Sequence, residues 1–422
     1  MSAMDKASAA LQSAADLPPP EAMPARFGAL PYHVAVAGHL RTGEAALWSW
    51  FESDQFSKRY SEMVKLELLK STYRLTRADQ PGLYAQADVA LNALGLDLPV
   101  TVYQRQGGGD GANAALIFLP DEAAIMLMGN IAELLSEGET LALLGHELAH
   151  HRLYTLDGGQ YFTAARLLDW CAEQPGCDAA FRETDRLYQL HTEIFADMGA
   201  LHVTSDRDAV IASLIKVSTG LRSVTARSYL EQTSEILEGD KAGSEGVTHP
   251  ELYIRAKALD LLAADPPRIG ETEALVRGKI EAGRLDILGQ HKLSTLSREL
   301  VDCLMVHPFM RGEYAANLAE RYFPGYRPAA VPSADHAAMA VEIAGLAKSC
   351  HDYLAFLLLD FATVDPDHGE AGLAWTLDLA DRIGLFTVYE ALARKELKRK
   401  KEDLTKLRRG AAEKIEKANH AA

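Results

Sequence analysis

Three side chains within five consecutive residues, His146, Glu147 and His150, are suited to metal chemistry. In a helix of about 3.6 residues per turn, positions four apart share one face, so both imidazoles can reach a single ion at about 2.0–2.1 Å. Glu147 lies about 100° further round the helix. Its carboxylate would stand beside the ion, where it can take a proton from bound water. This spacing predicts a zinc site with Glu147 as the general base.

A catalytic zinc requires a third protein ligand and an open position for water. Glu193 and Asp197 are four residues apart on a later predicted helix, so their carboxylates share one face. We expect Glu193 to complete a set of two histidines and one glutamate. We expect Asp197 to accept a hydrogen bond from the outer nitrogen of a ligand imidazole. The sequence therefore predicts one Zn²⁺ per chain.

The His-Glu-x-x-His pattern also occurs by chance in helices, where the two histidines merely line a wet groove. Its context here argues against chance, because Ser136-x-x-Glu139 is a capping box that opens the helix. His151 points about 100° away from the metal face, and we interpret it as structural or exposed. Tyr154 could donate to an oxyanion, as could Tyr188 and Tyr253. Aromatic residues at helical spacing are more often core, which is our interpretation of all three.

The elements that must position these residues follow from hydrophobic periodicity. Segments rich in β-branched and apolar residues predict a small three-stranded sheet before the zinc-binding helix, at Pro99–Tyr103, Ala114–Leu119 and Ala124–Met128. Apolar residues at three-to-four spacing predict helices on both sides of that sheet. They include Gly43–Leu94, the capped helix through His150, Phe162–Ala172 and about Asp178–His202. The predicted fold class is α+β, mainly helical.

Composition suggests how the chain divides. Residues 1–28 are rich in Ala, Ser and Pro and are predicted to be a disordered lead-in, followed by a catalytic domain at 29–322. A Pro- and Gly-rich stretch at 323–333 is the predicted linker to an all-helical accessory region at 334–422. Its tail, 394–417, holds more than twice as many basic as acidic residues. The C-terminal helices could therefore contact a partner, although a solvated helix with a weak apolar stripe is the simpler interpretation.

Charge and cysteine content exclude several classes of protein. The formal net charge is −16, so a nucleic-acid partner is not expected. The four cysteines form no Cys-x-x-Cys pair, which favours reduced thiols over a disulfide framework or a thiolate metal site. We see no secretory signal, and the longest apolar runs fall far short of the roughly 18 residues that a spanning helix needs. We therefore expect a cytoplasmic protein without a transmembrane segment. The sequence does not indicate its oligomeric state.

Four motifs, taken in order and spacing, resemble the gluzincin zinc metallopeptidases. More specifically, they are similar to those of the HtpX and CAAX-prenyl-protease group, metallopeptidase family forty-eight. The resemblance covers about 60–265. Many members carry transmembrane helices or an export signal; this chain shows neither and resembles a soluble branch. The motifs are Asn113-Ala114-Ala115, the run 143–151 around the histidines, Glu193-x-x-Ala196-Asp197, and Thr248-His249-Pro250 with Arg255.

The resemblance implies roles that spacing does not. A gluzincin-type domain would bind its substrate by pairing the peptide backbone with an edge strand, here the one that carries Asn113 and Ala114. His249 would stand near the open zinc position, where it either stabilises the oxyanion or caps the metal at rest. Arg255 would anchor the loop of that histidine.

The expected activity is that of a zinc metalloendopeptidase acting on protein or peptide substrates, in intracellular protein processing or quality control. The alternative is a catalytically silent or autoinhibited zinc-fold scaffold that binds a partner protein through its C-terminal helices. Retention of Glu147 argues against the scaffold, because a scaffold does not need a general base.

Overall fold

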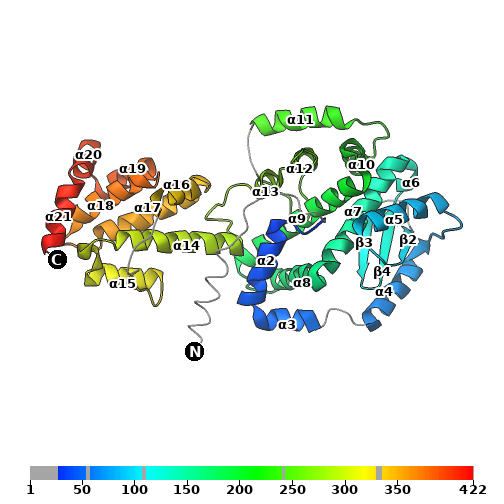
Figure 1. Cartoon of the computed structure of the whole chain (residues 1–422), viewed down its shortest axis with the longest axis horizontal. Coiled ribbons are helices and arrows are strands. Elements are labelled where there is room, and N and C mark those ends of the chain that lie inside the picture. Colours follow the sequence, from blue (N-terminus) through cyan, green and yellow to red (C-terminus); the bar gives the residue numbers. More distant parts are fainter. Residues whose placement is uncertain (1–26, 54–57, 107–110, 240–242, 329–334, 422) are drawn as a thin grey trace. The chain divides into compact units, whose positions relative to one another are not determined.

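The computed structural model describes residues 27–53, 58–106, 111–239, 243–328 and 335–421. Nearly all of the predicted lead-in, 1–28, lies outside them. The chain divides into two compact units, Met1–Gly278 and Lys279–Ala422. Both are mainly helical (Figure 1), and the first also contains a small sheet, so the α+β prediction is confirmed at this level. No helix in the described ranges combines the length and apolar character needed to cross a bilayer.

The first unit surrounds one sheet with helices. Its strands are β1 (Thr72–Arg74), β2 (Val100–Arg105), β3 (Asn113–Leu119) and β4 (Glu122–Met128). Its helices up to the predicted metal site are α2 (Pro31–Gly43), α3 (Ala45–Ser53), α4 (Lys58–Ser71), α5 (Pro81–Leu94), α6 (Ile131–Leu134) and α7 (Glu137–Thr155). They are followed by α8 (Gln160–Glu173), α9 (Ala179–Thr204), α10 (Arg207–Thr219), α11 (Ala226–Gly239), α12 (Leu252–Leu262) and α13 (Ile269–Arg277).

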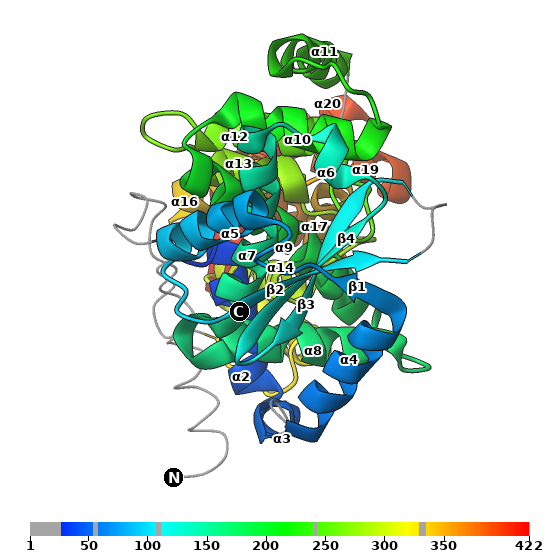
Figure 2. The same cartoon turned by 90° about the vertical axis from the view of Figure 1, so that its right-hand side faces the viewer.

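The sheet has the order β1-β2-β4-β3, and Figure 2 shows its strands together. β2 and β4 are parallel, whereas β3 pairs antiparallel with β4 from Asn113↔Met128 to Leu119↔Glu122 and forms one edge. The three predicted strands are present, but the prediction of a three-stranded sheet is wrong. The additional strand, β1, is only three residues long and directly follows α4. It lay inside a stretch with helical periodicity, and its pairing with β2 is a long-range contact that periodicity cannot reveal.

Helices α7 and α9 cross at very short range. α7 begins with the predicted capping box, in which Ser136 accepts from the Glu139 backbone and Glu139 accepts from the Ser136 backbone. At the crossing, a Cβ atom placed on Gly199 would lie 2.3 Å from the Cβ of Ala149. One placed on Gly145 would lie 3.2 Å from the Cα of Ala200. The two glycines therefore allow a separation that larger residues would prevent.

The second unit is all-helical. It contains α14 (Ile287–Leu304), α15 (Glu313–Tyr322), α16 (His336–Ala344), α17 (Lys348–Thr363), α18 (Gly369–Arg382), α19 (Phe386–Leu397), α20 (Lys401–Arg409) and α21 (Ala411–Ala421). The predicted C-terminal helices are thus present, and the basic tail is part of the fold. Leu404 and Leu407 of α20 are buried in the core of this unit, so the predicted apolar stripe has a packing role. The four cysteines are free thiols, as expected.

The division between the units differs from the predicted one. We placed the boundary at 323–333, but it follows Gly278. Leu300 and Leu304 of α14 share a core with Leu358 of α17, and Tyr326 of the predicted linker is buried in that core. The apolar stripe of a helix shows that it packs, but not which core it packs against. The sequence pattern therefore left α14 on the wrong side of the boundary.

The close contact between α7 and α9 leads to a testable prediction. Gly199→Ala should lower the free energy of unfolding by about 1–3 kcal/mol, because the added methyl overpacks a contact that is already closed. It should also weaken metal binding, since the two helices carry the predicted ligands. The matched control is Gly38→Ala in α2, where no atom beyond the adjacent residues and the local helix backbone lies within 4 Å of the added Cβ. Chemical denaturation of both variants measures the difference. Equal stability of Gly199→Ala and the parent would contradict the account of the crossing.

Candidate metal centre

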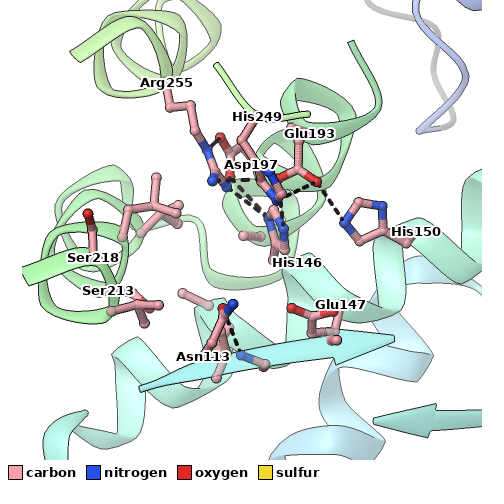
Figure 3. A pocket seen from close by; sticks show the side chains of 18 of the residues that line it. Asn113, His146, Glu147, His150, Glu193, Asp197, Ser213, Ser218, His249 and Arg255 are labelled. Atoms are coloured by element: carbon pink, nitrogen blue, oxygen red, sulfur yellow. Dashed lines mark hydrogen bonds and ion pairs between the residues drawn. The ribbon is translucent and has the colours of Figure 1, made fainter. Parts of the chain in front are cut away.

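The two histidines of α7 and Glu193 of α9 converge (Figure 3). One donor atom from each of His146, His150 and Glu193 lies within 4.8 Å of the others, so the three residues could hold a metal ion. The Nε2 atoms of His146 and His150 are each 3.6 Å from a different oxygen of Glu193. Donors about 2.0–2.1 Å from a four-coordinate ion lie roughly 3.3 Å apart. The two separations from Glu193 are close to this value.

Glu193 provides the test of whether an ion fits. Its Oε2 atom is buried and accepts no hydrogen bond from any residue in the described ranges. Its nearest charged neighbours, Arg255 Nη1 at 3.5 Å and His146 Nε2 at 3.6 Å, lie beyond normal hydrogen-bonding distance. A buried carboxylate oxygen without a hydrogen bond is costly. A cation among the three donor atoms would remove that cost.

A layer of polar residues behind the ligands fixes one imidazole. The Nδ1 atom of His146 donates to Oδ1 of Asp197 at 3.0 Å, which leaves Nε2 directed at Glu193, as predicted. Arg255 donates to both oxygens of Asp197, at 2.8 and 2.6 Å. Burial raises the pKa of Asp197, but the charge and hydrogen bonds of Arg255, together with His146, outweigh it and lower the pKa to about 2. Asp197 is therefore a fixed anion that orients the ligand.

The predicted role of Arg255 is wrong. We expected it to anchor the loop of His249, but its hydrogen bonds go to Asp197. Arg186 of α9 holds that loop instead, because its Nη1 donates to the backbone oxygens of Ser244 (3.1 Å) and Gly246 (2.7 Å). The sequence reasoning missed Arg186. Its one available signal was its position two helical turns before Glu193, which places it on the same face of α9.

His249 borders the open side of the triad. Its Nε2 atom is 3.5 Å from Oε1 of Glu193, and its Nδ1 atom is 2.9 Å from the hydroxyl of Thr248. The side chain is 61% exposed, so it can be reached from the cavity. This position beside the triad agrees with both roles that the resemblance implied, stabilisation of an oxyanion and capping of a metal.

Glu147 is close to the triad but is not one of its three residues. It is 5% exposed and lies between the two histidines and strand β3 (Figure 3). Burial raises the pKa of its carboxyl to about 6, although the charge of His146 and a hydrogen bond from the Leu116 backbone act in the opposite direction. A buried carboxylate with a pKa near neutrality can both accept and return a proton. The predicted position of Glu147 beside the ligands is confirmed.

The triad opens into a cavity of about 580 Å³. One wall is the edge strand β3, where Asn113 and Ala114 lie as predicted, and the Asn113 side chain accepts from the Ala114 backbone at 2.9 Å. Another part of the wall is α10, which contributes Ser213, Leu214 and Val217 among others. Sequence reasoning did not identify these three residues. Their three-to-four spacing indicates a common face but not what that face meets.

His151 is structural, as predicted. It is buried and its Nε2 atom bonds the backbone oxygen of Leu119 at 2.9 Å, which ties α7 to the end of β3. This bond lies away from the triad, so the residue that follows His150 directly helps to fix the strand beside which Glu147 stands.

Comparison of the chain with protein-family models, with curated proteins and with solved structures found no match. The resemblance to gluzincin metallopeptidases therefore stays a prediction from the four motifs. The geometry of the centre stands independently of it.

The pKa values of the two histidines shift in opposite directions, which leads to a prediction. Burial lowers the pKa of His146, but the hydrogen bond to Asp197 and the charge of Glu193 outweigh it and raise the pKa above its usual value. Burial lowers the pKa of His150 to about 4. A metal must displace a proton wherever His146 is protonated, so its affinity should fall as the pH drops through the pKa of that residue, by up to about tenfold per pH unit.

Titration calorimetry of the metal-free protein with zinc, in buffers of different ionisation enthalpy between pH 5.5 and 8, measures the proton released. Asp197→Asn removes the charge that raises the pKa of His146, so it should move the loss of affinity to lower pH. An affinity for zinc that does not change across this range would contradict the assignment of His146 as a ligand.

Proposed function

We propose that this protein is a zinc-dependent metalloendopeptidase that hydrolyses peptide bonds of protein or peptide substrates. The observation that carries the proposal is the position of Glu147, a buried carboxylate that stands beside a metal-binding triad and an open strand edge. Two imidazoles and one carboxylate favour zinc, since calcium and magnesium prefer all-oxygen sites. A site that only stored or sensed a metal would have no use for Glu147.

Substrate binding follows from the edge strand. β3 pairs with β4 on one side only within the described residues, so the N–H and C=O groups of its other side can pair with an extended peptide. Asn113 and Ala114 lie at the start of this strand, beside the triad. Such pairing would place a peptide carbonyl next to Glu147, while a neighbouring side chain of the substrate enters the cavity towards α10.

Each residue of the centre then has its own role in the reaction. His146, His150 and Glu193 would hold zinc, which supplies a Lewis acid that polarises the carbonyl and lowers the pKa of a water. Glu147 removes a proton from the attacking water at its carboxylate and returns it to the nitrogen of the leaving amine. Asp197 and Arg255 keep the Nδ1 proton of His146 in place, so that Nε2 remains a donor to the metal.

One observation supports a second candidate function. His249 Nε2 lies close enough to Glu193 to occupy the open side of the triad, which would make the resting protein autoinhibited. In the extreme case the zinc fold is a silent scaffold and the C-terminal helices bind a partner. The retained Glu147 makes the peptidase the better-supported proposal.

Replacement of the general base tests the proposal. Glu147→Gln should bind one zinc per chain, as the parent does, yet cleave peptides about 10²–10⁴-fold more slowly, because the amide cannot accept the proton. The matched control is Glu137→Gln, the same change at an exposed position of α7. Mass spectrometry of a peptide library, with and without a chelator, measures cleavage.

Two outcomes would contradict the proposal, and each contradicts a different part of it. A Glu147→Gln variant that cleaves as fast as the parent would remove the general base from the account. A parent that holds zinc and cleaves nothing would favour the silent scaffold.

A further inference from the structure

Tyr154 lines the cavity together with His150 and Glu193, although the sequence favoured a place in the core. It lies four residues after His150 and eight after His146 on α7, so all three side chains share one face of the helix. Four residues advance about 6 Å along the helix axis. Tyr154 is thus the next side chain in the row of metal ligands.

The ring of Tyr154 is held from two sides. Phe118 of β3 contacts it edge-on, with ring centres 5.4 Å apart, and Phe162 of α8 packs at 5.2 Å. These contacts restrict the direction of the hydroxyl group. The edge strand that would bind substrate is therefore also one of the supports of the tyrosine.

The hydroxyl of Tyr154 differs in its hydrogen bonding from the hydroxyl groups of the other buried tyrosines nearby. Tyr188 donates to the backbone of Tyr161 at 2.8 Å, and Tyr161 donates to Asp157 at 2.7 Å. Tyr154 makes no hydrogen bond to any residue in the described ranges, and its oxygen is not among the atoms fully buried without a partner. A largely buried tyrosine usually finds a partner for its hydroxyl. Tyr154 lines the cavity, and its hydroxyl donor is unused among the described residues.

We propose that the Tyr154 hydroxyl donates a hydrogen bond to the substrate carbonyl oxygen as negative charge develops on it. This inference rests on the proposed peptidase function. The carbonyl under attack must lie beside the triad. Tyr154 is on the same face of α7 as His146 and His150, and it carries a neutral hydroxyl that can act as a hydrogen-bond donor at this place. A donor fixed in advance stabilises a developing oxyanion more than it stabilises the uncharged carbonyl.

The electrostatics of the site keep this donor protonated. Burial, the negative charge of Glu193 and that of Asp169 raise the pKa of Tyr154 to about 12. The hydroxyl therefore retains its proton throughout the neutral range. Its role is to donate a hydrogen bond, and the proton stays on the tyrosine.

Tyr154→Phe tests the role because it removes the hydroxyl and keeps the ring that packs on Phe118 and Phe162. The variant should lose about 10²–10³-fold in kcat, while KM, zinc content and melting temperature stay close to those of the parent. The control is Tyr73→Phe, the same change at a site that is 60% exposed and outside the cavity.

Binding supplies a readout independent of turnover. A peptide phosphonamidate carries charged oxygens on a tetrahedral phosphorus and imitates the oxyanion. Tyr154→Phe should weaken its binding about 10²-fold, yet leave unchanged the binding of the uncleaved peptide, measured in a Glu147→Gln background. Equal weakening of both ligands would make Tyr154 part of an ordinary binding subsite and would overturn the proposal.

The remaining outcomes distinguish the proposed role of Tyr154 from the proposed peptidase function. If the parent cleaves peptides and Tyr154→Phe retains its kcat, the role of Tyr154 is wrong and the peptidase stands. A zinc-loaded parent that cleaves nothing overturns the peptidase, and the role of Tyr154 with it.

Discussion

The close crossing of α7 and α9 is the constraint on which the rest of the structure depends. One helix carries both imidazoles and the other carries Glu193, so their donor atoms meet only while the helix axes stay close together. Gly145 and Gly199 supply that closeness, because a Cβ atom on Gly199 would lie 2.3 Å from Ala149. The two glycines thus allow a candidate metal-binding set to assemble from segments over forty residues apart.

Charge indicates why a metal ion would complete the crossing. Asp197, Glu193 and Glu147 are all buried, and Arg255 is a permanent cation that faces them. His146 adds a second positive charge only while it is protonated, so the three carboxylates still exceed the cations. Arg255 compensates Asp197 directly, whereas Glu193 keeps an oxygen without a hydrogen bond. Buried charges are stable only when they are paired or bind a metal. A divalent ion among the imidazoles would balance the charge, while Glu147 remains a carboxylate held away from the ion.

The parts of the site that the sequence predicted are those determined within one element. The spacings of the histidines and of Glu193 with Asp197 are local to a helix, as is the capping box of α7, and the structure confirms each arrangement. The parts that it missed depend on which elements meet in space. The pairing of β1, the support of the His249 loop by Arg186 and the place of Tyr154 in the cavity wall arise from contacts between distant segments. Periodicity records that a side chain faces a neighbour, but not which neighbour.

X-ray absorption spectroscopy at the zinc edge tests the central claim most directly, because it counts the donor atoms around the ion. The zinc-loaded protein should show four light donors at about 2.0–2.1 Å, with the multiple-scattering signature of two imidazoles, and Glu193→Ala should lose one oxygen donor. Sulfur donors at about 2.3 Å, or fewer than two imidazoles, would contradict the proposed centre.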